Sequence, residues 1–111
     1  MKKLIIILSL FVCLFAQAKE YTVKEIPMVH LQDSTRYVSN PDNILSTSAV
    51  ATMDSILHSL EQKTGIQTLV VTVTGIEGGD CFDFAHRLGQ EWGVGQKGRD
   101  NGLVILLSTD E

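Results

Sequence analysis

The amino-acid sequence predicts an α/β domain in which parallel central strands lie between helices. Two apolar segments, 66–74 and 103–107, lack the alternation of a half-exposed strand and are typical of strands covered on both faces. An amphipathic segment precedes each of them, at 46–65 and at 80–92. Because the connection between the two strands contains a helix, we expect the strands to be parallel and the crossover to be right-handed.

The first helix is expected to begin after Ser46, whose hydroxyl can accept a hydrogen bond from a free backbone N–H of the first turn. Lys63 lies in its last turn, and Gly65 supplies the left-handed residue that ends it. Apolar residues at steps of three and four predict one apolar stripe, formed by Val50, Met53, Leu57 and Leu60.

The segment Ile66–Thr74 is rich in β-branched residues and predicts a buried strand. Asp80 is the expected N-cap of a second helix that ends at Gly93. The inner face of this helix is predicted from the spacing of Cys81, Phe84, Ala85, Leu88 and Trp92.

The N-terminus has the pattern of a secretory signal peptide over residues 1–18. Lys2 and Lys3 precede an apolar run at 4–15, which is shorter than the roughly 20 residues of a membrane-spanning helix. Small residues at positions 16 and 18 precede the predicted cut after Ala18, so we expect an exported protein, periplasmic or extracellular, that begins at Lys19; a retained anchor is the alternative. A short strand at 21–26 and an irregular stretch at 27–43 are expected next.

The charge and the cysteine and histidine content exclude several classes of protein. Thirteen acidic residues against nine basic ones give a net charge of −4, which argues against nucleic acid and anionic membranes as partners. Cys13 lies in the predicted signal peptide, so Cys81 has no partner for an internal disulfide. His30, His58 and His86 lack metal-ligand spacing and are expected at the surface.

The segment from Trp92 to Gly102, followed at once by an apolar strand, resembles the signature of TPM domains, a group that includes thylakoid-lumen phosphatase-like proteins and many exported bacterial proteins. The segments 37–46 and 64–73 also resemble this family. The resemblance divides the chain into a signal peptide at 1–18, a lead-in at 19–34 and a TPM-like domain at 35–111. The motif residues of the loop are Trp92, Gly93, Gly95, Lys97, Gly98, Asp100, Asn101 and Gly102.

This resemblance implies a mixed sheet between helices, in a domain that a later transmembrane helix often tethers. The family usually continues with a hairpin strand, a Gly-rich segment and further helices. We therefore expect the C-terminal part of the domain to be missing from this chain. Membrane contact is expected only through the removed signal peptide or an absent downstream anchor. The segment 103–107 is then expected to leave an unpaired strand edge that favours association.

Acidic side chains are expected to gather beyond the carboxyl ends of the parallel strands, where ligands of open α/β sheets bind. Asp42 and Asp110 are the principal candidates, with Asp80 and Glu111 beside them. Carboxylates in such a crevice suit Ca²⁺ or Mg²⁺, and the resemblance adds that members of the family have been linked to divalent cations. The alternative is a set of ordinary cap and turn residues. No organic cofactor is indicated.

The glycine-rich loop is expected at the opposite end of the sheet from these acids. Lys97 and Arg99 are suited to holding an anion there, whereas Asp100-Asn101-Gly102 is also a strong turn signal. Both interpretations stay open.

Two function classes follow from the sequence and the resemblance. One is a non-catalytic binding or accessory module of the cell envelope, which binds partners or helps to assemble or maintain envelope complexes and to which a divalent cation can bind. The other, which rests mainly on the resemblance, is a metal-dependent hydrolase of phosphomonoesters with Asp42 and Asp110 as metal ligands.

Overall fold

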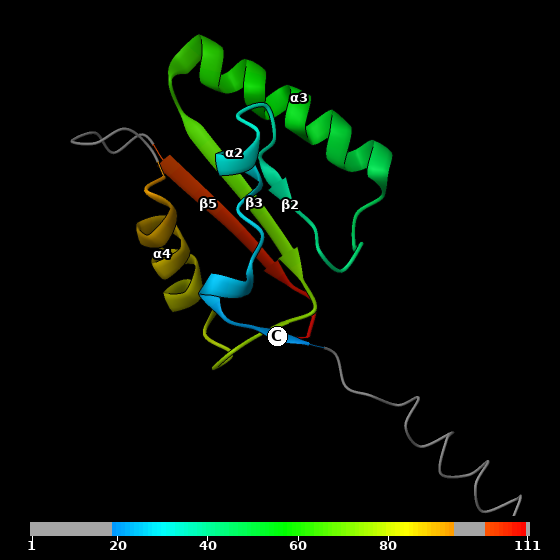
Figure 1. Ribbon diagram of the computed structural model, residues 1–111, viewed down its shortest axis with the longest axis vertical. Helices are drawn as coiled ribbons and strands as arrows, with labels where there is room; N and C mark the ends of the chain where they lie inside the picture. Colours follow the sequence, from blue (N-terminus) through cyan, green and yellow to red (C-terminus); the bar gives the residue numbers. More distant parts are fainter. Residues whose placement is uncertain (1–18, 95–101, 111) are drawn as a thin grey trace, which may run out of the picture.

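The computed structural model describes residues 19–94 and 102–110 of the chain (Figure 1). Parallel strands form two small sheets, and helices pack against the larger one. The predicted α/β fold is therefore confirmed. In chain order, the elements are β1 (Glu20–Tyr21), a 3₁₀ turn η1 (Val23–Glu25), α2 (Val29–Gln32), β2 (Val38–Ser39), α3 (Thr47–Thr64), β3 (Gln67–Val73), β4 (Gly75–Ile76), α4 (Cys81–Trp92) and β5 (Gly102–Ser108).

The larger sheet has the strand order β2-β3-β5, so β3 lies in the middle. The pairing of β3 with β5 is parallel over the whole of both strands, from Gln67 opposite Gly102 to Val73 opposite Ser108. The shorter β2 pairs with the centre of β3, also in parallel. The smaller sheet joins β1 to β4. The predicted parallel relation between the two apolar strands is confirmed.

The ends of α3 and α4 are fixed by the capping residues that the sequence predicts. The Ser46 hydroxyl accepts a hydrogen bond from the Ala49 N–H at 3.1 Å. The Asp80 carboxylate accepts one from the Asp83 N–H at 3.0 Å. Both helices end at a glycine in the left-handed conformation, Gly65 with φ 75° and Gly93 with φ 61°.

The main core lies between β3 and α4. Leu69, Val71 and Val73 of β3 face Phe84 and Leu88 of α4, and all five are buried. The other face of β3 lies on the side of α3, which packs on β2 and β3. Figure 1 shows α3 and α4 on opposite sides of the sheet. None of the described helices is long and apolar enough to cross a membrane.

Two expectations for residues 21–43 are wrong. The strand expected over 21–26 ends at Tyr21, because the chain turns into η1 at once. The stretch expected to be irregular, 27–43, contains α2 and β2. Side chains of this segment reach the core, since Tyr21, Ile26 and Tyr37 are all buried there.

The expectation that the second apolar strand is covered on both faces is also wrong for the described residues. Val104 and Leu106 pack against the core on the α4 side. Leu103, Ile105 and Leu107 lie on the opposite face and are 51%, 48% and 48% exposed. Their neighbours on β3 are buried beneath α3, but α3 does not extend over β5.

Two glycine substitutions test how the helix ends are determined. Gly65→Ala should lower the free energy of unfolding by about 1 kcal/mol, because an alanine is strained at φ 75° although nothing lies within 4 Å of its added carbon. Gly89→Ala, inside α4, should raise the free energy of unfolding by roughly 0.5–1 kcal/mol, because alanine favours the helix more than glycine does. The added carbon makes only an ordinary 3.6 Å contact with Val104.

Urea denaturation of the full chain and both variants measures these changes. Equal changes in the free energy of unfolding would show that the backbone conformation of the glycine does not determine the effect.

Candidate functional site

The carboxyl end of β3 is organised around the carboxylate of Asp42. Its Oδ1 accepts a hydrogen bond from the Tyr21 hydroxyl at 2.7 Å. Its Oδ2 accepts from the backbone N–H of Thr74 at 2.9 Å and from the Thr74 hydroxyl at 3.1 Å. Asp42 therefore links the lead-in strand to the residue that follows β3.

The neighbouring Asn40 stabilises the same loop. Its Oδ1 accepts hydrogen bonds from the Ile44 and Leu45 N–H groups and from the Thr72 hydroxyl. Its amide nitrogen donates to the Leu45 carbonyl at 2.8 Å. These contacts hold the loop that carries Asp42 against the end of β3.

The hydrogen bonds of Asp42 change the protonation of both partners. Burial alone would raise the pKa of Asp42, but the bonds from Tyr21 and Thr74 outweigh it and hold the pKa below its usual range. Burial and the hydrogen bond to the Asp42 carboxylate raise the pKa of Tyr21 to about 12. The pair is thus a carboxylate and a neutral phenol at neutral pH.

The other predicted metal ligands lie in different settings. Asp110 lies at the same end of β3 as Asp42, because the backbone N–H of Asp110 donates to the Thr74 carbonyl at 2.8 Å. Asp80 is the N-cap of α4, and Glu111 lies outside the described residues. Within residues 19–94 and 102–110, no three His, Cys, Asp or Glu side chains lie close enough together to hold a metal ion. Cation binding at Asp42 and Asp110 stays a prediction.

The glycine-rich motif loop is described only at its two ends. Trp92 is a core residue that packs beside Leu88, and its indole nitrogen has no acceptor among the residues described. Gly93 ends α4, and Gly102 opens β5. The rest of the motif, together with Arg99, lies outside the described residues: Gly95, Lys97, Gly98, Asp100 and Asn101.

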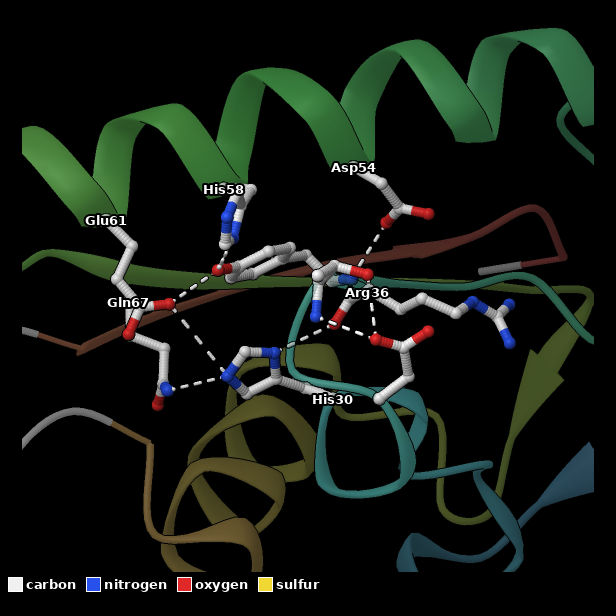
Figure 2. A network of polar contacts seen from close by, with 9 residues as sticks. His30, Arg36, Asp54, His58, Glu61 and Gln67 are labelled. Atoms are coloured by element: carbon white, nitrogen blue, oxygen red, sulfur yellow. Dashed lines mark hydrogen bonds and ion pairs between the residues drawn. The ribbon is translucent and has the colours of Figure 1, made fainter.

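A second polar cluster lies at the opposite end of β3, between α2 and α3 (Figure 2). The buried Tyr37 donates its hydroxyl hydrogen to Glu61 Oε1 at 2.6 Å, and His58 Nδ1 lies 3.1 Å from the same hydroxyl. Burial and the Glu61 carboxylate raise the pKa of Tyr37 well above its usual value. Asp54 accepts from the N–H groups of Tyr37 and Val38, which fixes β2 beneath α3.

His30 belongs to this cluster, contrary to the expectation that the histidines lie at the surface. Its side chain is only 13% exposed. Its Nδ1 contacts the Arg36 carbonyl at 2.8 Å and must donate, so its Nε2 in the neutral ring accepts from the Gln67 amide at 2.9 Å. His86, in contrast, is exposed and stacks on Phe82, as expected for a surface residue. The cluster ties the lead-in to α3 and β3.

Two exposed surfaces border β5, one on each face of the strand. One is the row of half-exposed residues Leu103, Ile105 and Leu107. The other is an open groove of about 530 Å³ between α4 and β5. The groove is lined by Phe82, Ala85, His86, Gly89, Gln90, Val94, Gly102 and Val104.

The family of the chain is decided by comparison with known sequences. The sequence model of the TPM domain matches residues 38–111, which is most of the chain. The chain belongs to the TPM domain family. The resemblance found in the motif loop is thereby confirmed. The match begins at Val38, the first residue of β2, and includes Asp42 and the whole of α3, β3, α4 and β5.

A solved structure supports the TPM fold of this chain. It is the solution NMR structure of the N-terminal domain of a protein from P. gingivalis, with 32% sequence identity and a TM-score of 0.75. The similarity covers 83% of this chain and 59% of that one, so this TPM chain spans little more than half of the solved domain. A search of curated proteins found no match.

The Asp42 cluster makes stability depend on pH. Asp42→Asn should lower the free energy of unfolding at neutral pH by about 1–2 kcal/mol, because the carboxylate accepts three hydrogen bonds. The folded pKa lies below the unfolded value of about 3.9. The stabilisation is therefore complete above that value and is lost as the pH falls through the folded pKa.

Urea denaturation between neutral pH and pH 3 measures this dependence. Asp110→Asn is the matched control, because Asp110 is exposed. The loss of stability in Asp42→Asn should shrink as the pH falls. A loss that stays constant, or an equal loss in the control, would contradict the stabilising role of the Asp42 carboxylate.

Proposed function

We propose that this TPM-domain chain is an exported, non-catalytic module that binds a protein partner in the cell envelope. One observation carries the proposal: Leu103, Ile105 and Leu107 form a half-exposed apolar row on a strand that otherwise belongs to a buried sheet. Single exposed apolar residues are ordinary, whereas a contiguous row is typical of interaction sites.

The chemistry of this row favours a polypeptide over other ligands. Its side chains carry no charge, and the chain as a whole is acidic, which disfavours nucleic acid and anionic lipid surfaces. Export is proposed from the signal-peptide pattern of residues 1–18, with Lys19 as the first residue of the exported protein and the periplasm or extracellular space as its location.

A second candidate function is a divalent-cation site, and with it phosphomonoester hydrolysis, at the carboxyl end of β3. The observation that favours it is that Asp42 and Asp110 both contact Thr74, one through its side chain and the other through its backbone. Against it, the Asp42 oxygens already accept three hydrogen bonds, so a cation would have to share or displace them.

Site-specific photo-crosslinking in cells tests the binding module. A photoreactive amino acid in place of Ile105 should give a discrete protein adduct, because this position lies at the centre of the apolar row. The same substitution at Ser59, on the exposed side of α3, should give none. No adduct at position 105, or the same adduct pattern at both positions, would contradict a partner at this surface.

Calorimetry and a turnover assay test the second candidate. If the purified chain binds Ca²⁺ or Mg²⁺, Asp110→Asn should weaken binding and Asp100→Asn, in the motif loop, should not. Loss of binding only in Asp100→Asn would put the cation at the other end of the sheet. We expect no turnover of a chromogenic phosphate ester with either cation. Turnover that is lost in Asp110→Asn would contradict a non-catalytic module and support a hydrolase.

A further inference from the structure

The Glu61 carboxylate lies within reach of two other segments in the polar cluster at the amino end of β3 (Figure 2). Its Oε1 accepts the hydroxyl hydrogen of Tyr37 at 2.6 Å. The Nε2 atom of His30, on α2, lies 3.9 Å from the same oxygen. The side chains of His30 and Glu61 are only 13% and 28% exposed, so salt screens this pair less than an exposed one. Glu61 is therefore placed to stabilise a positive charge on His30.

His30 is satisfied at both ring nitrogens in its neutral form. Its Nδ1 donates to the Arg36 carbonyl at 2.8 Å, because a carbonyl can only accept. Its Nε2 then carries no hydrogen and accepts from the side-chain amide of Gln67 at 2.9 Å. Neutral His30 therefore links α2 to the first residue of β3.

Protonation of His30 changes its partner at Nε2 and leaves the hydrogen bond at Nδ1 in place. The added hydrogen makes Nε2 a donor, and the Gln67 amide nitrogen at 2.9 Å is a donor as well, so the two repel. The Glu61 carboxylate attracts the new charge. Gln67 must then move away or turn its amide oxygen toward the ring, and His30 and Glu61 must approach each other to hydrogen-bond distance.

The other acidic groups around His30 already have hydrogen-bond donors. Asp54, on α3, accepts from the backbone N–H groups of Tyr37 and Val38. Asp33, which follows α2, accepts from the backbone N–H and the hydroxyl of Thr35. Among the residues described, Glu61 is thus the carboxylate that lies nearest to ion-pair contact with the His30 ring.

The remaining neighbours of His30 are basic or uncharged. Arg36 contributes its backbone carbonyl, and Figure 2 shows its guanidinium pointing away from His30. His58, on α3, contacts the Tyr37 hydroxyl at 3.1 Å, so a charge on His58 would disfavour a second charge on His30. In the described part of the chain, β3 and α4 face His30 with the uncharged side chains of Gln67 and Trp92.

We propose that His30 is a pH-sensitive latch of the lead-in: neutral His30 binds the Gln67 amide on β3, and protonated His30 binds the Glu61 carboxylate on α3. Acidification thereby replaces a link from α2 to the sheet by a link from α2 to α3. A charge-assisted hydrogen bond is about twice as strong as a neutral one, so the protonated form holds α2 more firmly. This gain is present at acidic pH and is lost as the pH rises through the titration of His30. The latch is independent of the proposed partner surface on β5.

An NMR titration of the isotope-labelled full chain tests the latch between about pH 8 and pH 5, the range in which imidazole changes its charge. At the alkaline end, His30 should carry its ring hydrogen on Nδ1 and none on Nε2. The side-chain amide signals of Gln67 and the backbone amides of α2 should then move with the same midpoint as His30. The exposed His86 is the internal reference, and its titration should not be followed by these signals.

Two substitutions should shift the midpoint of the His30 titration in opposite directions. Glu61→Gln should lower the midpoint by at least about half a pH unit, because an opposite charge favours the charged ring. Gln67→Leu should raise the midpoint, because it removes the hydrogen bond to the neutral ring. Glu77→Gln, at the opposite end of β3, is the matched control and should leave the midpoint unchanged.

Three results would overturn the inference: a midpoint that Glu61→Gln leaves unchanged, shifts of the midpoint in the same direction in both variants, or Gln67 signals that do not move with His30. The last of these is measured on the unsubstituted chain, so it decides the exchange of partners even where a variant does not fold.

Discussion

Parallel pairing on both sides of β3 is the constraint on which the rest of the structure depends. A parallel neighbour cannot be reached by a tight turn, so each pairing requires a crossover connection that carries a helix. The crossover from β2 to β3 contains α3, and the crossover from β3 to β5 contains α4. The two helices cover opposite sides of the sheet, α3 over β2 and β3 and α4 over β5. Among the residues described, one face of β5 is consequently left without a helix, and this is the surface proposed to bind a partner.

The two polar clusters hold the lead-in to this framework from both ends of β3. At the carboxyl end, Asp42 joins Tyr21 to Thr74. At the amino end, Glu61 on α3 accepts the hydrogen bond of Tyr37. Buried polar groups without partners are costly, so each cluster specifies one position for the lead-in rather than adding a large net stabilisation. Asp42 thus has a structural role, because it joins Tyr21 to Thr74.

The sequence was sufficient to predict α3, β3 and α4, because their signals are local. Ser46 and Gly65 mark the ends of α3 within a few residues of the helix itself. In contrast, β2 is a strand only because Val38 and Ser39 pair with β3, more than thirty positions away. Nothing in the neighbouring residues indicates that pairing, and tertiary contacts override local propensity in such short segments.

The arrangement of the candidate sites could also be predicted only in part. The end of the sheet at which Asp42 and Asp110 lie follows from strand direction, and in the structure both residues contact Thr74. The hydrogen bond from Tyr21 to Asp42 joins residues that are far apart in the sequence, and no periodicity indicates it. His30 was missed for the same reason, because its partner Gln67 lies on another element.

Amide hydrogen exchange along β5 tests most directly whether this strand has an open edge. In the free chain, at a concentration where it is monomeric, the amides of Ile105 and Leu107 should be protected, because they face β3. The amides of Val104 and Leu106, which face away from β3, should exchange much faster. Equal protection of all four amides would contradict an open edge at β5.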